Sequence, residues 1–249
     1  MKVSLLISTY NWPEALDLTL TGTAAQSRLP DEILIADDGS REETRRLIDS
    51  WRERLPIPLH HLWQEDLGFR AGQIRNKAIA AAAGDYIIQV DGDVFFRRHF
   101  ICDHVLFAKP GTFVNGSRVN VGPELTARLL SGEKEKVDSW RKGVSNLFNG
   151  IRWPLLSPLF ARRKSRDLIE VRGCNMAFWR EDLLRVGGYN EKMTGWGLED
   201  SELAVRLGKS GVRKRTLKFA GIVYHLYHKE RSREHVERNR EILRQASKE

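Results

Sequence analysis

The stretch DYIIQVDGDVFF, residues 85–96, runs from an apolar strand into two acids, Asp91 and Asp93, separated by one glycine. Two carboxylates this close repel each other and lose solvation unless a cation lies between them. Mn²⁺ and Mg²⁺ prefer carboxylate ligands, and both commonly bridge to phosphate groups. An isolated Asp-Gly-Asp would suit a solvated turn better. The apolar residues on both sides favour a divalent metal site at the end of a buried strand.

Apolar strands alternate with helical segments through the first hundred residues. Strands are predicted at 2–9, 31–37, 59–63 and 85–90, and helices from Pro13, at 41–55 and at 71–84. This alternation predicts an α/β fold with a doubly wound, mostly parallel sheet. Ligands of such sheets lie beyond the carboxyl ends of the strands. The polar clusters STYN, DDGS and DGD at those ends are therefore predicted to form one site.

The composition favours an anionic partner. The 249 residues include 41 Lys and Arg against 33 Asp and Glu, which gives a net charge of +8. Such an excess suits nucleotide phosphates, nucleic acid or an acidic membrane surface. Cys102 and Cys174 have no zinc-like spacing, and two free thiols are expected. No signal peptide and no run of about 18 apolar residues is found, so we expect a cytoplasmic protein.

A second acidic motif lies in GWGLEDSEL, residues 195–203. Glu199 and Asp200 precede a predicted helix from Ser201, and acids there could merely cap it. That alternative is as good as a functional one for the two acids alone. Trp196 between two glycines favours the functional interpretation, because an exposed indole face is a natural platform for a sugar ring.

Two histidines end the chain's last predicted strand, residues 219–228. His225 and His228 lie within YHLYH, and a histidine pair beside acid clusters suggests metal ligands. Side chains three residues apart on a strand face opposite sides. At most one of the two is therefore expected to bind a metal ion directly, unless the strand has already ended.

Neither a GxGxxG nor a GxxxxGK[ST] motif is present, which argues against dinucleotide and P-loop phosphate binding. Taken together, the motifs make the chain resemble family 2 glycosyltransferases of the GT-A fold. More narrowly, it resembles bacterial members whose second half is related to β-1,4-galactosyltransferases and chondroitin polymerases. The matching stretches are VSLLISTYNWPEAL, EILIADDGS, GFRAGQIRNKAIAAAAGDYIIQVDGDV, RGCNMAFWREDLLRVGGYNE, GWGLEDSELAVRL and VYHLYH.

The resemblance implies a nucleotide-sugar site in a Rossmann-like first half and an acceptor site in the second. On the donor side it implies roles for Thr9, Tyr10 and Asp38 at the nucleobase and ribose, Arg75 near the diphosphate, and Asp91 and Gly92 of the DXD motif. It implies that Asp93 binds Mn²⁺ or Mg²⁺ directly, with Asp91 beside it. His225 would complete the metal site, and His228 is the weaker candidate.

On the acceptor side, the resemblance implies that Asp200 is the catalytic base and that Trp196, Gly197 and Glu199 hold the acceptor. A single positioned carboxylate suits direct displacement with inversion at the anomeric carbon. We therefore expect an inverting, metal-dependent transferase. It would move a hexose or N-acetylhexosamine from a UDP-sugar to a hydroxyl of a glycan or lipid-linked glycan. The transferred sugar, the acceptor and the oligomeric state stay open.

Two other functions are compatible with parts of the sequence. Nucleotidyl transfer onto a sugar phosphate shares the sheet but usually has a Gly-rich basic loop after the first strand, which STYNWPEA lacks. Nucleic-acid binding would suit the net charge. However, the arginines of the tail alternate with glutamates, as in a solvated helix, so no nucleic-acid partner is expected.

The chain is expected to form one domain with four parts. These are a nucleotide-sugar half at 1–117, a variable insertion at 118–170, an acceptor and metal half at 171–228, and a charged helix at 229–249. The part from 119 to 168 mixes aromatic and basic residues. It is either a helical insertion on the core or an element on the inner face of the cytoplasmic membrane, where an anionic surface presents a lipid-linked acceptor.

Overall fold

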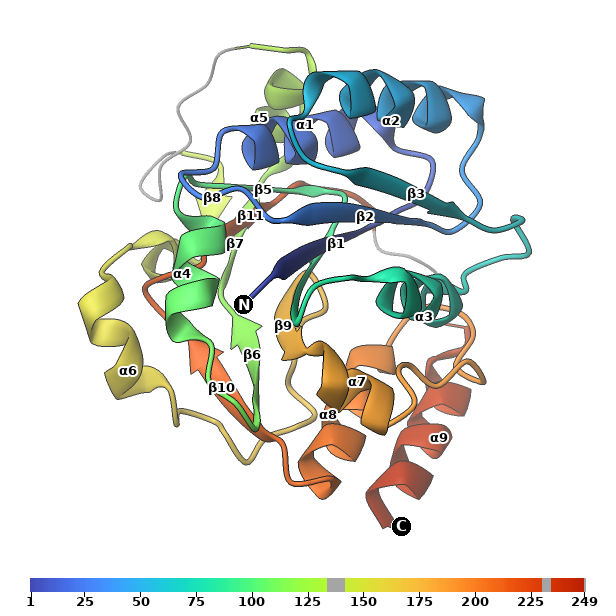
Figure 1. The fold of residues 1–249 in the computed structure, drawn as a ribbon, viewed down its shortest axis with the longest axis vertical. Coiled ribbons are helices and arrows are strands. Elements are labelled where there is room, and N and C mark those ends of the chain that lie inside the picture. Colours follow the sequence, from blue (N-terminus) through green and yellow to red (C-terminus); the bar gives the residue numbers. More distant parts are fainter. Residues whose placement is uncertain (134–141, 230–233, 249) are drawn as a thin grey trace.

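A seven-stranded sheet in the order β10-β6-β9-β4-β1-β2-β3 forms the centre of the molecule (Figure 1). The structure is a computed structural model that describes residues 1–133, 142–229 and 234–248. The predicted strands of the first hundred residues all form and run parallel: β1 (Val3–Thr9), β2 (Glu32–Asp37), β3 (Leu59–Trp63) and β4 (Tyr86–Asp91). The prediction of a mostly parallel α/β sheet is confirmed.

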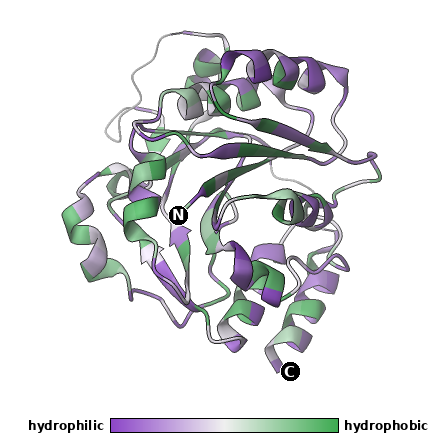
Figure 2. Cartoon of the chain, viewed as in Figure 1, coloured by the Kyte–Doolittle hydropathy of each residue, from purple (hydrophilic) through white to green (hydrophobic). Residues whose placement is uncertain are grey.

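Helices cover both faces of this sheet (Figure 1). On one face lie α1 (Pro13–Ala24), α2 (Glu42–Arg54) and α4 (Phe100–Phe107), and on the other α3 (Ala71–Ala81), α7 (Arg180–Arg185) and α8 (Glu199–Lys209). Alternate residues of β1 serve the two faces: Leu5 and Ile7 pack towards α1 and α2, while Leu6 packs towards α3. Burial on both sides explains why the central strands are mostly hydrophobic (Figure 2).

The second half of the chain adds the other three strands to this sheet. β9 (Asn175–Trp179) lies between β4 and β6 (Thr112–Gly116) and is antiparallel to both, and β10 (Arg213–Leu217) pairs in parallel with β6. Because β9 hydrogen-bonds directly to β4, the two halves share one sheet. The acids at the end of β4 therefore lie where both halves can contribute side chains.

A second, four-stranded sheet has the order β5-β11-β7-β8. Its strands are β5 (Val94–Phe96), β11 (Val223–His225), β7 (Arg118–Val121) and β8 (Val144–Ser145). The predicted strand 219–228 is thus too long, because the chain leaves the sheet after His225. The Leu226 amide then donates to the Asp93 carbonyl at 3.0 Å, and the Tyr227 amide to Thr126 Oγ1 at 2.9 Å.

The region predicted as an insertion, 118–170, contributes β7 and β8 to this sheet and otherwise forms short helices. These are α5 (Pro123–Leu130), η1 (Leu147–Gly150), η2 (Pro154–Leu156) and α6 (Ser157–Phe160), while 134–141 lie outside the described residues. Pro154 and Pro158 explain why no long helix forms here. Among the described residues, no helix has both the length and the apolar character needed to cross a membrane.

The charged C-terminal helix forms as α9 (Val236–Lys248) and packs on α8, while 230–233 and 249 lie outside the described residues. It is more than the solvated helix expected from its composition. Asn239 is fully buried, and its Nδ2 donates to the carbonyls of Thr194 at 3.3 Å and Gly197 at 3.0 Å. The tail therefore supports the loop of residues 195–197 that precedes α8, called here the GWG loop.

Asn175, at the start of β9, ties the two sheets together, and its loss is expected to destabilise the fold. Its Nδ2 donates to the carbonyls of Ser117 and Gly221, both at 2.8 Å, and its Oδ1 lies 3.0 Å from His104 Nε2. Asn175→Ala should lower the free energy of unfolding by roughly 2–4 kcal/mol, since several buried polar groups would lose their partner. Urea unfolding followed by circular dichroism measures this.

Asn149→Ala is the matched control for that variant. Asn149 is only half-buried; its Nδ2 donates to one carbonyl, that of Arg118, and its Oδ1 accepts from the Lys218 ammonium. Its replacement should therefore cost about 1 kcal/mol or less. Equal losses in the two variants would contradict a special role for Asn175.

Candidate active site

The guanidinium of Arg75 joins the acids of the two halves. Arg75 comes from α3 and is 4% exposed. It donates to Asp91 Oδ1 at 3.1 Å, to Asp200 Oδ1 at 3.3 Å and to Ser8 Oγ at 3.0 Å. These bonds connect the carboxyl ends of β1 and β4 to the first turn of α8. The cation that faces Asp91 is therefore Arg75, a pairing that the sequence alone did not indicate.

Asp93 forms a separate cluster with His225 and His228. One potential ligand atom from each residue lies within 4.8 Å of the others. His225 is brought there by strand pairing, because β11 runs antiparallel to β5 and places His225 opposite Val94, the neighbour of Asp93. His228 joins the cluster because β11 has already ended at His225, which is the exception that the sequence analysis left open. Among the described residues, Asp91 is not a member of this cluster.

The donor set of the cluster fits a divalent cation. Nδ1 of His225 lies 2.9 Å from the carbonyl oxygen of Leu226, and Nδ1 of His228 lies 2.9 Å from that of Lys229. When each Nδ1 donates to its carbonyl, Nε2 keeps a lone pair, and both Nε2 atoms face Asp93, at 3.6 and 3.4 Å. Asp93 Oδ1 is buried and has no hydrogen-bond partner among the described residues. A bound cation would satisfy it.

Glu199 and Asp200 lie in the first turn of α8, not ahead of it as predicted. Glu199 Oε2 accepts a hydrogen bond from the Gly197 amide at 3.0 Å. Glu199 therefore partly stabilises the backbone just before α8, much as the capping alternative proposed. Asp200 instead faces the interior, where its Oδ1 accepts from Arg75 and from the Tyr189 hydroxyl at 2.9 Å. The two neighbouring acids therefore serve different purposes.

Asp200 Oδ2 lies against a glycine. A Cβ atom built on Gly173 would come 2.2 Å from this oxygen, so any side chain at that position would displace the carboxylate. Burial raises the pKa of the Asp200 carboxyl, although Arg75 opposes the change. A raised pKa suits a group that must accept a proton near neutral pH.

Burial also raises the pKa of Glu199, to about 7, with Asp200 adding to the rise and Arg75 opposing it. Because this pKa lies above the unfolded-state value near 4.5, ionisation of Glu199 destabilises the folded chain as pH rises from 4.5 to 7. Glu199→Gln should therefore stabilise the protein above pH 7, by at most roughly 3–4 kcal/mol at about 1.4 kcal/mol per pKa unit. Melting temperatures of both proteins from pH 4 to 8 test this. A stability difference that does not vary with pH would contradict it.

Sequence reasoning missed Tyr189 and Gln89, which complete the surroundings of Asp200. The Tyr189 hydroxyl lies 2.9 Å from both Asp200 Oδ1 and Gln89 Oε1, and its ring lies 5.2 Å from the Arg75 guanidinium carbon. The backbone of Tyr189 is held by Asn76, which bonds both its amide and its carbonyl. Gln89 is a polar residue within an otherwise apolar strand, and this feature of the sequence could have indicated a buried polar site there.

The residues predicted for the nucleobase and ribose gather at the carboxyl ends of β1 and β2. Asp38 Oδ1 accepts from Gln64 Nε2 at 2.6 Å, and its Oδ2 accepts from the Arg70 amide at 2.7 Å. The Tyr10 hydroxyl donates to Asp66 Oδ2 at 2.8 Å. Asp38 is thus oriented by the protein, and Asp66 joins the set without having been predicted.

Thr9 and Gly92 touch where β1 and β4 end. The Gly92 amide donates to the carbonyl of Ser8 at 2.7 Å, and a Cβ on Gly92 would lie only 3.2 Å from Thr9 Cβ and Oγ1. A glycine between Asp91 and Asp93 therefore lets the two strand ends approach each other closely.

The GWG loop reaches α8 through left-handed backbone. Gly195, Gly197 and Leu198 have φ values of 74°, 111° and 73°. A Cβ on Gly195 would come 2.4 Å from the ring of His235, so glycine is needed there for space as well as for conformation. Trp196 between them is 38% exposed, which leaves part of its ring open to solvent, as the acceptor prediction requires.

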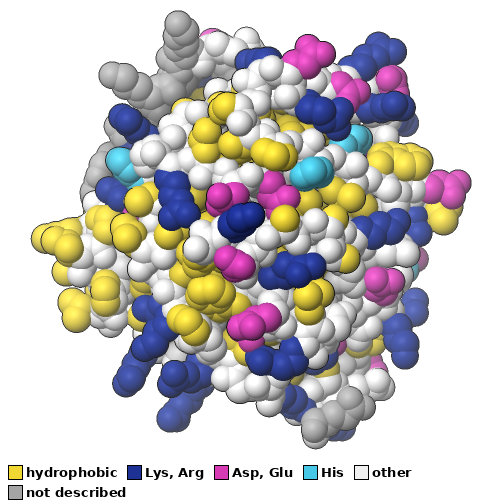
Figure 3. Space-filling model, viewed as in Figure 1, with side chains coloured by type: hydrophobic (Ala, Val, Ile, Leu, Met, Phe, Trp, Pro, Cys, Tyr) yellow, Lys and Arg dark blue, Asp and Glu magenta, His cyan; other side chains and the backbone are white. Residues whose placement is uncertain are grey.

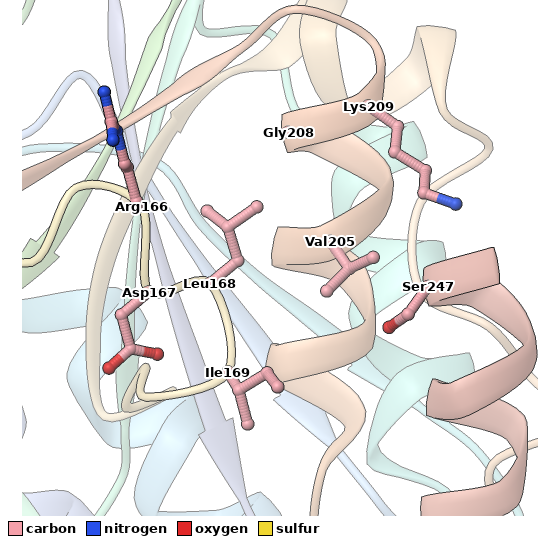
Figure 4. Close-up of a pocket in the computed structure, with 8 residues that line it drawn as sticks. All are labelled: Arg166, Asp167, Leu168, Ile169, Val205, Gly208, Lys209 and Ser247. Carbon is pink, nitrogen blue, oxygen red and sulfur yellow. The ribbon is translucent and has the colours of Figure 1, made fainter. Parts of the chain in front are cut away.

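A groove of about 500 Å³ lies away from these residues, between the 166–169 loop, α8 and α9 (Figure 4). Leu168, Ile169 and Val205 lie between the loop and the helices. A Cβ on Gly208 would come 2.4 Å from Leu168 Cδ1, so this glycine lets the loop pack on α8. The residues that line the groove include none of the predicted site residues.

Comparison with known protein families matched two models. The model for glycosyl transferase family 2 matches residues 4–186, and the model for the N-terminal domain of galactosyltransferase matches residues 162–229. The second match covers the GWG loop, α8 and both histidines.

Among curated proteins, a validoxylamine A glucosyltransferase of Streptomyces hygroscopicus subsp. limoneus is 31% identical over 228 residues, which cover 84% of this chain and 48% of that protein. A chondroitin synthase of Escherichia coli is 27% identical over 252 residues, which cover 90% of this chain and 34% of that protein. The chain thus spans about half or less of the length of these relatives.

Two solved structures share the fold. Staphylococcus aureus TarS 1–349 in complex with UDP superposes with a TM-score of 0.66 at 17% identity, covering 99% of this chain and 65% of that one. The mannosyltransferase PcManGT from Pyrobaculum calidifontis, in complex with GDP-Man and Mn²⁺, gives a TM-score of 0.62 at 22% identity, covering 90% and 56%. At these identities the likeness shows the fold alone, which is the GT-A fold.

Proposed function

This chain belongs to glycosyl transferase family 2, and from that premise we propose that it transfers a hexose or N-acetylhexosamine from a UDP-sugar to a hydroxyl of a glycan or lipid-linked glycan. The observation that carries the proposal is the pair of hydrogen bonds that Arg75 donates to acids from the two halves of the chain. Arg75 pairs with Asp91 and Asp200, and so ties the end of β4 to the acid pair of α8. Asp93 of the potential metal cluster lies two residues after Asp91. The UDP complex of TarS and the glucosyltransferase relative support a nucleotide-sugar donor.

On the donor side, Asp93, His225 and His228 would hold Mn²⁺ or Mg²⁺. The ion, when bound, supplies positive charge for the diphosphate leaving group. Thr9, Tyr10 and Asp38 would hold the nucleoside at the ends of β1 and β2. Asp38 is buried and already oriented by Gln64, so it can offer its carboxylate without reorganisation.

Arg75 has a different role in this proposal from the one implied by resemblance. Its three bonds to Ser8, Asp91 and Asp200 engage the guanidinium inside the protein. Arg75 therefore fixes the distance between the donor-side and acceptor-side acids. It also keeps Asp91 paired, so that two half-buried carboxylates can lie one residue apart.

On the acceptor side, Asp200 would accept the proton of the attacking hydroxyl at Oδ2. Its Oδ1 is occupied by Arg75 and Tyr189, which hold the carboxylate in one orientation. The bond from the acceptor oxygen to the anomeric carbon forms as the bond from that carbon to the diphosphate oxygen breaks. Attack opposite the leaving group inverts the anomeric configuration. Trp196 and Glu199 would position the acceptor sugar.

Calorimetric titration of UDP and a panel of UDP-sugars, with Mn²⁺ and then with EDTA, tests the proposal without knowledge of the acceptor. We expect binding that requires the metal ion, and the tightest UDP-sugar identifies the donor. Absence of binding under both conditions would refute the donor assignment. Binding of equal strength in EDTA would refute the metal assignment.

A further inference from the structure

One segment of the molecule exposes apolar side chains that nothing in the catalytic proposal uses. Phe148, Trp153, Leu155 and Leu159, from η1 to α6, are 69%, 56%, 85% and 77% exposed. Among the described residues, twelve large apolar side chains are exposed, by 38% or more, and four of the twelve lie in this short segment. Isolated exposed apolar residues are normal, but a concentration of them marks an interaction surface.

The same segment is strongly basic. Residues 146–166 contain no Asp or Glu, but they include Arg162, Arg163, Lys164 and Arg166, all exposed. Lys164 pairs with Glu170, whereas the three arginines form no ion pair with a described acid. Burial lowers the pKa of nearby Lys218, and Arg163 lowers it further, as expected where positive charge accumulates.

Hydrogen bonds to backbone carbonyls hold this segment on the fold. The Trp153 amide donates to the Phe219 carbonyl at 2.8 Å, and Ser157 Oγ donates to the Lys218 carbonyl at 2.6 Å. The segment is thereby attached to the chain just before β11. In Figure 3, hydrophobic side chains project at the left edge, where Figure 1 places α6, and Lys and Arg side chains lie below them. The apolar and basic groups are therefore neighbours on one protruding edge.

We propose that Phe148, Trp153, Leu155, Leu159, Arg162 and Arg163 form a docking surface for an anionic lipid membrane, called here the apolar-basic surface. Apolar side chains enter the boundary between headgroups and acyl chains, tryptophan favours that boundary, and cations bind the lipid phosphates. Charge complementarity points to lipid, because this edge combines exposed apolar groups with cations that have no described acid to pair with. The surface is separate from the proposed donor and base residues, so the proposal does not depend on sugar transfer.

Vesicle flotation tests the proposal with the whole chain. We expect the protein to float with vesicles of phosphatidylcholine and phosphatidylglycerol, to float much less with phosphatidylcholine alone, and to bind less tightly as salt rises. Two double variants, Leu155→Ser with Leu159→Ser and Arg162→Gln with Arg163→Gln, should each weaken partitioning roughly tenfold or more.

Matched controls replace similar side chains elsewhere. Leu106→Ser removes an apolar side chain on α4 that is 76% exposed, and Arg45→Gln with Arg46→Gln removes two exposed arginines from α2. Both controls should float like the parent chain. Circular dichroism establishes that each variant is folded, and UDP titration, which should be unchanged in all of them, reports separately on the donor site.

Several outcomes would overturn the proposal. Failure to float with anionic vesicles is one, and equal flotation with neutral vesicles is another, since it would remove the role of the arginines. Flotation of both double variants at parental levels would place the contact elsewhere. The parent chain could also sediment as a dimer while the double variant Leu155→Ser with Leu159→Ser sediments as a monomer. That result would show that a second copy, not lipid, covers the surface.

Discussion

Asp200→Asn is expected to lower the turnover of sugar transfer by roughly 10²–10⁴-fold, the usual contribution of a positioned general base. Asparagine has nearly the shape of aspartate and can still accept from Arg75 and Tyr189 through its oxygen. It cannot take the proton of an acceptor hydroxyl. Metal-dependent UDP binding should therefore stay within about twofold of the parent value, because the change in free energy lies in the chemical step. Steady-state kinetics and calorimetry on the same protein measure the two quantities.

The pH dependence of turnover offers a second readout of the same residue. Asp200 must be ionised to act as a base, and burial raises its pKa. Turnover of the parent chain should therefore fall as pH decreases through that raised pKa, and the residual activity of Asp200→Asn should lack this acidic limb.

Glu202→Gln is the matched control, because Glu202 lies two residues further along α8 and pairs with Arg206 instead of with Arg75. Its loss should reduce stability but leave turnover of the folded protein close to normal. Near-normal turnover in Asp200→Asn would show that the base has been assigned to the wrong residue.

Asp93→Ala is expected to abolish metal-dependent UDP binding. Loss of an outer-shell partner of a metal ligand already costs 10–100-fold in metal affinity, so loss of the ligand should cost roughly 100-fold or more. The variant would leave the Nε2 atoms of His225 and His228 facing each other without a carboxylate. Titration of Mn²⁺ alone, and of UDP with Mn²⁺, measures the effect.

Asp85→Asn provides the comparison for Asp93→Ala. Asp85 is an exposed acid just before the other end of β4, where it accepts the Lys2 amide, so its replacement should change neither Mn²⁺ nor UDP affinity. His225→Ala should weaken Mn²⁺ binding more than His228→Ala does, because the side chain of His225 is 14% exposed and that of His228 is 35% exposed. Unchanged Mn²⁺ affinity in Asp93→Ala would remove the metal site from this cluster.

The local sequence was sufficient to predict the elements of the first half and the edge where the site would lie. The apolar runs of β1, β2 and β4 and the helical periodicity between them depend on neighbouring residues, and the structure has these elements close to the predicted bounds. The position of Asp91 and Asp93 at a strand end follows from the same short-range pattern. The roles of Asp200 and His225 came from the family resemblance, because hydrophobic periodicity gives no information about the function of a side chain.

Tertiary structure decided which charged groups meet. Asp91 faces Arg75 and not the metal cluster, because α3 packs beside the ends of β1 and β4. His225 reaches Asp93 through the pairing of β11 with β5, strands that lie far apart in the chain. Asn239, read as part of a solvated tail, supports the GWG loop. Sequence patterns report the preference of each segment for helix or strand, whereas the partner of a buried charge is chosen by contacts between distant segments, which only the assembled fold defines.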